Sequence, residues 1–356
     1  MMTKNLTYKD SGVDIEAGNK TIDYIKPLAK RTNRKEVLSG VGGFSGLFAI
    51  PQGYKEPVLV ASTDGVGTKL KLAFKLNMHE TVGVDLVAMC VNDLICCGAE
   101  PIFFLDYFAT GKLSPEQARD VVKGISEGCL QSNCTLLGGE TAELPGFYEN
   151  GEYDLAGFSV GVVEKSKIID GSKIEKGDVL IGIESSGLHS NGYSLAQKVC
   201  FELANWDLNY KHPELTKPIA EELLIPTIIY TKLIKDLISK FEIKGIANIT
   251  GGGFTENIPR VFPENISCEI DLSSYSRPRI FKILQEVGGI ERDEMLKTFN
   301  NGLGMVLITS PGNEEKIIDE VKVHGLKAYK IGITKEGNDV DAGSPRVVYK
   351  GDFNNA

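Results

Sequence analysis

One six-residue segment, D-G-V-G-T-K at 64–69, combines several kinds of phosphate-binding group. Asp64 could ligate Mg²⁺, and Lys69 could place a cation beside a phosphate. Gly65 and Gly67 let backbone N–H groups approach a ligand closely. An ordinary strand–turn–helix connection with a solvated lysine is the alternative, and it is the more common meaning of such a segment in isolation. The surrounding acidic residues favour phosphate chemistry.

The apolar segment 81–97 is predicted to be a buried helix, yet it carries three polar residues, Asp85, Asn92 and Asp93. A charge on a buried helix is costly unless it is paired or bound to a metal. Asp85 and Asn92 are seven residues apart and share a helix face. They could bind backbone groups or belong to a site, whereas we expect Asp93 to bind a metal.

A further acidic residue, Glu140, follows two glycines in the segment L-G-G-E-T-A-E-L-P-G. Together with Asp64 and Asp93 it would form a set of carboxylate oxygens suited to Mg²⁺ that bridges phosphates. Glu143, three residues later, could equally be an exposed loop residue.

His189 lies in S-S-G-L-H-S-N-G-Y, just before a predicted helix. This position suits proton transfer or substrate binding, and a loop histidine without such a role is the alternative. The three glycines at 251–253 follow a strand, and they could bind a phosphate or form a tight turn. The other histidines, His79, His212 and His324, are expected on the surface.

These residues require strands that end at glycine turns and helices that follow them. The glycine-rich stretch 38–53 is predicted to be a mobile loop and matches neither the Walker A nor the Rossmann pattern. Gly98 should end the helix at 81–97, and Ser114 should cap a helix that starts at Pro115. The predicted strands lie at 57–62, 101–108, 135–137, 156–163, 179–183 and 245–249, and the other predicted helices at 69–76, 115–133, 193–203 and 226–240.

Length and composition limit the class of protein. The chain has 356 residues, which suits two domains, and we place them at 1–168 and 169–356 because 170–178 is polar and turn-rich. A net charge of -9 disfavours nucleic acid as a partner. The start has no apolar signal region, and no apolar run is long enough to span a membrane. Seven cysteines without a C-x-x-C pair indicate reduced thiols, so a cytoplasmic protein is expected.

Several segments together resemble the AIR synthetase family over nearly the whole chain, to about residue 350. They are Y-K-D-S-G-V-D-I at 8–15, S-T-D-G-V-G-T-K-L at 62–70, V-D-L-V-A-M-C-V-N-D-L at 84–94, F-F-L-D-Y-F-A-T-G-K-L at 103–113, G-G-E-T-A-E-L-P-G at 138–146, S-S-G-L-H-S-N-G-Y-S-L at 185–195 and I-T-G-G-G-F-T-E-N-I-P-R-V at 249–261.

The resemblance implies a ligase that forms a C–N bond in de novo purine synthesis. This family converts formylglycinamidine ribonucleotide and ATP into aminoimidazole ribonucleotide, ADP and phosphate through an iminophosphate. ATP and Mg²⁺ are the implied cofactors, with K⁺ as a further candidate. The implied α/β (α+β) fold has two domains and forms a homodimer. The N-terminal domains of two subunits join in a β-barrel with helices outside, and the C-terminal domain is an α/β domain with a mixed sheet.

The resemblance also assigns roles by position. Asp64, Asp93 and Glu140 would hold Mg²⁺, and the glycine loop at 40–46 would close over ATP. Lys26, Lys69 and His189 would be the catalytic residues. The nucleotide would contact Gly40, Gly42, Gly43, Asp64, Gly65, Gly67, Thr68, Lys69 and Asn92, and the substrate would contact His189, Ser190, Asn191, Gly251 and Gly252.

Other enzymes share this Mg-ATP architecture and are the alternatives. They include selenophosphate synthetase, thiamine-phosphate kinase, the hydrogenase-maturation dehydratase and formylglycinamidine synthetase. The first usually has an N-terminal cysteine or selenocysteine, but this chain has no cysteine before Cys90. The last is far longer. A regulatory subunit that only binds nucleotide would not need Lys69, three acids and His189 together.

Overall fold

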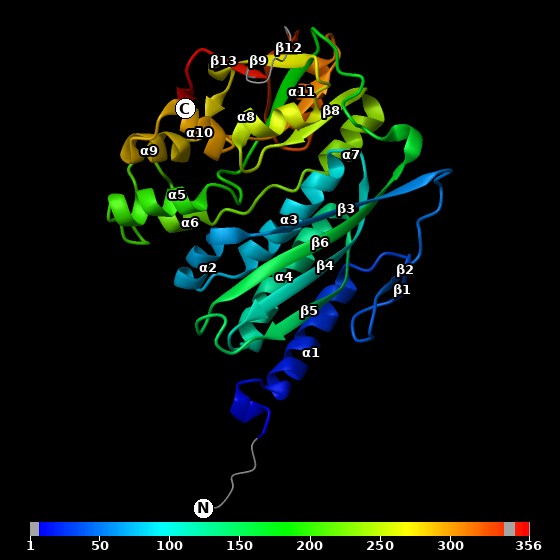
Figure 1. The fold of residues 1–356 in the computed structure, drawn as a ribbon, viewed down its shortest axis with the longest axis vertical. Coiled ribbons are helices and arrows are strands. Elements are labelled where there is room, and N and C mark those ends of the chain that lie inside the picture. Colours follow the sequence, from blue (N-terminus) through cyan, green and yellow to red (C-terminus); the bar gives the residue numbers. More distant parts are fainter. Residues whose placement is uncertain (1–6, 338–345, 356) are drawn as a thin grey trace, which may run out of the picture. The chain divides into compact units, whose positions relative to one another are not determined.

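A computed structural model describes residues 7–337 and 346–355. The chain divides into two compact units (Figure 1). The first comprises Met1–Leu94 and Pro101–Val162, and the second comprises Ile95–Glu100 and Val163–Ala356. Both units mix helices and strands, so the predicted two-domain α/β architecture is confirmed in the single chain.

A four-stranded sheet in the order β3-β6-β4-β5 forms the centre of the first unit. Its strands are β3 (Pro57–Gly65), β4 (Glu100–Thr110), β5 (Thr135–Glu143) and β6 (Tyr153–Glu164), and β4 runs parallel to β5. Helices α3 and α4 lie behind these strands in Figure 1. The helices of this unit are α1 (Ile15–Arg31), α2 (Leu70–Leu76), α3 (Glu80–Ile95) and α4 (Pro115–Ser132).

Glycines allow α3 and α4 to pack with their backbones in contact. A Cβ on Gly83 would collide with the Val121 carbonyl, and one on Gly124 would collide with the Glu80 carbonyl. The caps of these helices agree with the sequence prediction. Gly98 has a positive φ after α3, and Ser114 accepts a hydrogen bond from the Gln117 amide at the start of α4.

The opposite face of the four-stranded sheet is open in the single chain. Leu59 on β3, Phe158 on β6 and Tyr107 on β4 are 57%, 41% and 42% exposed. These three strands are neighbours in the order β3-β6-β4. The expected barrel is therefore not closed within one chain.

The second unit contains a six-stranded sheet in the order β13-β9-β12-β7-β11-β8. Its strands are β7 (Val179–Glu184), β8 (Ile243–Asn248), β9 (Ile266–Asp271), β11 (Leu303–Thr309), β12 (Ala328–Glu336) and β13 (Val347–Lys350). The β13–β9 pair is parallel and the others are antiparallel. A separate small sheet pairs β10 (Ser276–Arg277) with β14 (Asn354–Asn355).

Buried side chains form two clusters in this second unit. One contains Phe254 and Leu296, and the other contains Leu237 and Val321. The helices are α5 (Tyr193–Gln197), α6 (Ile219–Leu223), α7 (Thr231–Lys240), α8 (Gly253–Asn257), α9 (Arg279–Gly288), α10 (Arg292–Thr298) and α11 (Glu314–Val323). In the part of the chain that the structure describes, no helix is both long and apolar enough to cross a membrane.

Three predictions of local structure need correction. The glycine-rich stretch contains a short antiparallel pair, β1 (Val37–Ser39) with β2 (Leu47–Phe48). The helix predicted at 226–240 begins at Thr231, because Pro226 and the β-branched residues after it disfavour a helix. The helix predicted at 193–203 is α-helical only to Gln197 and continues as a π-helix.

His79 is buried rather than exposed as predicted. Its Nδ1 lies 2.9 Å from the Tyr153 hydroxyl, and its Nε2 lies 3.1 Å from the Asn77 side-chain oxygen. Asn77 adopts a left-handed conformation at the end of α2 and so turns the chain back toward the core. Because burial lowers the pKa of His79, the ring serves as a neutral hydrogen-bonding group of the core.

Candidate functional site

Asp64 and Asp93 come from different elements of the first unit and influence each other. Asp64 lies near the end of β3, and Asp93 is the exposed acid on the otherwise buried end of α3. Burial raises the pKa of Asp64, and the charge of Asp93 raises it further. A carboxylate whose ionisation is disfavoured by burial and by a neighbouring acid fits a divalent cation, because the cation would favour its charged form.

Lys69 is fully enclosed, and its ammonium lies 2.8 Å from the Asp85 carboxylate, which is also fully buried. Burial lowers the pKa of Lys69, whereas the nearby Asp85 opposes that shift. The solvated-lysine alternative is therefore wrong. Lys69 joins the turn after β3 to helix α3 through Asp85, and a direct contact with phosphate would require its ammonium to leave that carboxylate.

The other residues predicted to contact the nucleotide lie on α3, in the turn after β3 and in the glycine loop. Asn92 is buried on α3, and Gly67 has a φ of 70° in the turn after β3. In the glycine loop, Gly42 has a φ of 120°, and a Cβ added there would lie 3.7 Å from the Lys26 side chain. The structure thus brings the exposed Lys26 of α1 next to this loop. Gly40 and Gly43 belong to the same loop, and Gly65 and Thr68 flank Gly67.

Glu140 lies on the opposite face of the sheet from Asp64 and Asp93. Its neighbour Gly139 pairs with Asp106 and faces the helices, because a Cβ at Gly139 would collide with the Asp106 carboxylate. Strand alternation then places Glu140 on the open face with Tyr107, its partner in the β4–β5 register. One chain alone does not gather the predicted set of three carboxylates around one point.

Asp106 is an acidic residue for which the sequence patterns predict no role. It lies on β4 against Gly139, and burial raises the pKa of its carboxyl group to about 7. The residue still keeps partial contact with solvent. Its position inside the apolar segment F-F-L-D-Y-F was the available signal, because a lone acid in a buried strand is unusual.

Changing Asp106 to Asn should remove a pH dependence of stability. Because the folded-state pKa is raised from 3.8 to about 7, the folded chain keeps a proton that the unfolded chain loses between these values. Wild-type stability should therefore fall as pH rises from about 4 to about 7, by up to about 4 kcal/mol and less with partial exposure. Melting temperatures of wild type and Asp106→Asn at pH 5 and pH 8 measure this effect. Parallel pH profiles would contradict it.

The predicted substrate residues of the second unit meet in two loops. Asn191 accepts a hydrogen bond from the Gly251 amide over 2.9 Å, which joins the loop after β7 to the turn at 251–253 after β8. Ser190 lies 3.1 Å from the Thr227 hydroxyl. Gly252 has a φ of 94°, which favours glycine. His189, Ser190, Asn191, Gly251 and Gly252 therefore form one connected group.

His189 is held in an uncommon backbone conformation, with a φ of 60°. Its ring is buried, and its Nε2 accepts a hydrogen bond from the Ser186 amide over 3.2 Å. A neutral ring with this acceptor carries its proton on Nδ1. A Cβ on Gly304 would crowd both His189 and the Tyr230 hydroxyl, so glycine on β11 leaves room for the imidazole.

The amide nitrogen of the Asn191 side chain is shielded from solvent and has no hydrogen-bond partner among the described residues. A buried unsatisfied donor costs free energy, about 1–3 kcal/mol. A ligand oxygen placed against this group would remove that cost. The Asn191 side chain therefore offers a hydrogen-bond donor that a ligand oxygen would satisfy.

Two family models match the chain, each described as AIR synthase related protein. The N-terminal domain model covers residues 48–163 and the C-terminal domain model covers 175–343. The phosphoribosylformylglycinamidine cyclo-ligase of Syntrophotalea carbinolica is 57% identical over 345 residues, which are 97% of this chain and 98% of that protein.

Solved structures with low sequence identity share the fold. A thiamine-monophosphate kinase from Stenotrophomonas maltophilia K279a aligns with a TM-score of 0.65 at 16% identity, over 94% of this chain and 96% of that one. The hydrogenase maturation protein HypE in complex with ATP aligns with a TM-score of 0.65 at 14% identity, over 95% and 92%. At these identities the likeness concerns the fold alone.

Proposed function

The chain belongs to the AIR synthase related protein family and acts as an ATP-using phosphoribosylformylglycinamidine cyclo-ligase of purine biosynthesis, and we propose here how its residues divide that reaction. The assignment of this activity rests on 57% identity over 97% of the chain to a curated cyclo-ligase. The thiamine-monophosphate kinase is only 16% identical, so its likeness supports no shared activity.

We propose that the reaction proceeds through an iminophosphate. The formyl oxygen of formylglycinamidine ribonucleotide attacks the γ-phosphorus of ATP, and the bond to ADP breaks. An internal nitrogen then attacks the activated carbon, and the C–O bond breaks to release phosphate that contains the former formyl oxygen. Two protons are lost as the ring becomes aromatic and the oxygen leaves with the phosphate. Such chemistry depends mainly on positioning and on neutralisation of phosphate charge.

Asp64 and Asp93 are the residues that we propose to hold Mg²⁺. Burial and the charge of Asp93 both raise the pKa of Asp64, which supports this role, since the cation would offset both effects. Bound Mg²⁺ would neutralise charge on the ATP phosphates. Glu140 stays a proposed Mg²⁺ ligand from the sequence, but it lies on the opposite face of the sheet and could not share one ion with Asp64 and Asp93 of the same chain. A role for K⁺ remains a proposal without a candidate set of ligands.

For the nucleotide, we propose contacts with the glycine loop, Lys26 and the turn after β3. The closeness of Gly42 to the Lys26 side chain supports a joint role, because the backbone N–H groups of a glycine loop and an exposed cation can bind a phosphate together. Lys69 remains a proposed catalytic residue, and its pairing with Asp85 indicates that it acts at least partly by fixing the turn that carries Asp64. The remaining members of this proposed set are Gly40, Gly43, Gly65, Gly67, Thr68 and Asn92.

For the substrate, we propose the connected group of His189, Ser190, Asn191, Gly251 and Gly252. The shielded Asn191 amide supports this role because it offers a donor to a phosphate or ribose oxygen. His189 is the proposed proton-transfer residue. Its Nε2 accepts a hydrogen bond from the Ser186 amide, so its Nδ1 carries the proton in the neutral ring.

We also propose that the chain is a homodimer through the open face of the four-stranded sheet. Leu59, Phe158 and Tyr107 expose apolar surface on three adjacent strands, which is unfavourable in water. The same face of a second copy would cover it about a twofold axis and would complete the expected barrel from two sheets.

Phe158→Lys should break this dimer, because two lysines would be buried in a symmetric apolar interface. Light scattering after size-exclusion chromatography should give twice the chain mass of 38.7 kDa for wild type and a single mass for the variant. Leu203→Lys, at a position 63% exposed in the second unit, is the matched control and should remain a dimer. A wild-type monomer at micromolar concentration would contradict the proposal.

The proposed function is tested by product analysis of the purified full chain. With formylglycinamidine ribonucleotide, ATP and Mg²⁺ present, aminoimidazole ribonucleotide and ADP should appear in equal amounts. Thiamine monophosphate and selenide, offered instead, should not stimulate ADP formation. Absence of the aminoimidazole, or faster turnover with either alternative acceptor, would overturn the assignment.

A further inference from the structure

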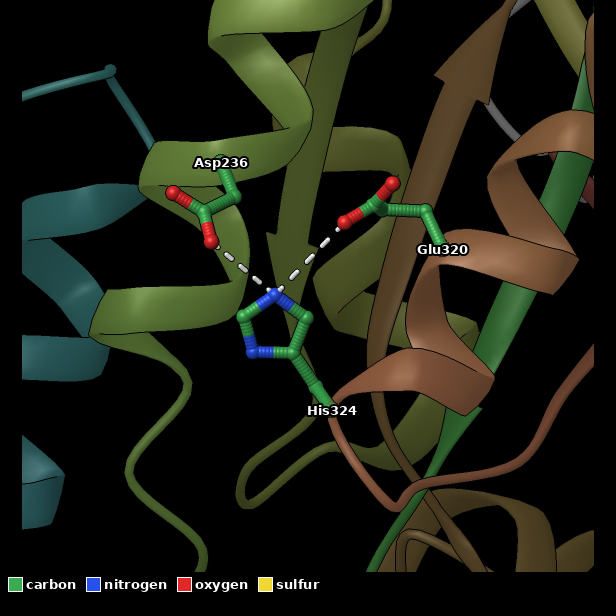
Figure 2. A group of neighbouring side chains, drawn as sticks. All are labelled: Asp236, Glu320 and His324. Carbon is green, nitrogen blue, oxygen red and sulfur yellow. Dashed lines mark ion pairs between the residues drawn. The ribbon is translucent and has the colours of Figure 1, made fainter.

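Three side chains outside the proposed ring-closing residues converge on one point in the second unit (Figure 2). Asp236 extends from α7, Glu320 extends from α11, and His324 caps the end of α11. The Nε2 atom of His324 lies 3.0 Å from Asp236 Oδ2 and 3.9 Å from Glu320 Oε1. One atom from each residue lies within 4.8 Å of the other two.

The helices that carry these residues are held by a common core. Leu233 and Leu237 of α7 are buried in the same cluster as Ile317 and Val321 of α11. Glu320 and His324 are four residues apart, so they share one helix face. The three side chains are therefore directed toward one point by packed elements, so the two helices would not have to move to bind an ion.

The donor set indicates which ion would fit. One imidazole nitrogen and two carboxylate oxygens suit Zn²⁺ and similar transition-metal ions, whereas Mg²⁺ prefers oxygen ligands alone. Bonds of about 2.1 Å in tetrahedral geometry separate ligand atoms by about 3.4 Å. The two observed separations, 3.0 and 3.9 Å, lie on either side of that value. Asp236 is half exposed, so water could reach a fourth position.

The Lys240 ammonium would compete with a bound cation for the Glu320 carboxylate. Its ammonium lies 2.7 Å from Glu320 Oε1, the oxygen atom that faces His324. Without an ion, the four residues form a network of ion pairs when His324 is protonated. An entering cation would have to displace the Lys240 ammonium from Glu320, and this competition provides a test that separates metal binding from a purely structural network.

We propose that Asp236, Glu320 and His324 bind one divalent transition-metal ion, with Zn²⁺ as the best match, independently of the ring-closing residues. The site joins α7 to α11 and stabilises the second unit when it is filled. Metal binding here requires neutral His324 and ionised carboxylates, so the ion replaces the proton of the imidazole.

The test is a Zn²⁺ titration of the full chain after treatment with a chelator, in excess Mg²⁺ so that oxygen-only sites are occupied. One Zn²⁺ per chain should bind with a dissociation constant in the micromolar range, and at 100 times that concentration the ion should stabilise the fold by about 2.7 kcal/mol. Co²⁺ should give the visible spectrum of a tetrahedral nitrogen- and oxygen-ligated ion.

Variants determine whether these residues are the ligands. His324→Gln should weaken binding at least tenfold, whereas His212→Gln, a change in another histidine of the same unit, should have no effect. Lys240→Met should tighten binding several-fold, because the competing cation is removed from Glu320. Binding only at millimolar Zn²⁺, unchanged binding in His324→Gln, or weaker binding in Lys240→Met would overturn the proposal.

Discussion

Replacing Lys69 alone by Met is expected to destabilise the chain by about 3–5 kcal/mol, because it leaves the Asp85 carboxylate buried without its counter-ion. Both side chains are fully enclosed and their charged atoms are 2.8 Å apart. Shifts of the urea unfolding midpoint measure the loss. Lys71→Met is the matched control, since Lys71 pairs with Glu152 at the surface and exposed pairs contribute about 1 kcal/mol or less.

The double variant Lys69→Met/Asp85→Leu separates stability from catalysis. Apolar residues of similar volume can replace a buried ion pair at little cost, so most of the lost stability should return. Turnover should stay far below wild type if Lys69 serves the reaction. A double variant that recovers both stability and turnover would show that Lys69 is only structural. If Lys69→Met causes no more destabilisation than Lys71→Met, the buried pair is not formed.

Changing Asp93 to Asn is expected to reduce turnover at least about 100-fold with little loss of fold, because the exposed carboxylate is a proposed metal ligand. The Mg²⁺ concentration for half-maximal activity should rise. Stability should be kept or slightly improved, since the charge of Asp93, which adds to the effect of burial in raising the pKa of Asp64, is removed.

Steady-state kinetics across a Mg²⁺ titration, together with melting temperatures, test the Asp93 prediction. Glu127→Gln, which neutralises an exposed acid on α4, is the control and should behave like wild type. Full activity of Asp93→Asn at ordinary Mg²⁺ concentrations would remove Asp93 from the metal site. A collapse of stability would instead indicate a structural role.

Local sequence patterns were sufficient for the strand, turn and helix that carry Asp64 and Asp93. An acid at the end of an apolar strand and an acid on an apolar helix are visible without a structure. The partner of Lys69 was not predictable in the same way. Asp85 lies sixteen residues further along the chain, and only the packing of the turn against α3 brings the two charges together.

Local sequence pattern also could not predict which face of the sheet Glu140 occupies. The β4–β5 register shifts between Phe104 and Leu105, and one residue of shift moves a side chain to the other face of a strand. For Asp106, by contrast, the sequence already shows an unusual residue. A lone acid in an apolar segment is visible in the sequence, but only the structure shows that Asp106 packs against Gly139 of the neighbouring parallel strand.

The fate of the formyl oxygen tests the central claim most directly. Formylglycinamidine ribonucleotide labelled with ¹⁸O in the formyl group should be converted by the purified chain with ATP and Mg²⁺, and the phosphate should be analysed by mass spectrometry. We predict one ¹⁸O atom in each phosphate released, with none in ADP, because the γ-phosphoryl group is transferred to that oxygen before ring closure. Aminoimidazole formation accompanied by unlabelled phosphate would contradict the account.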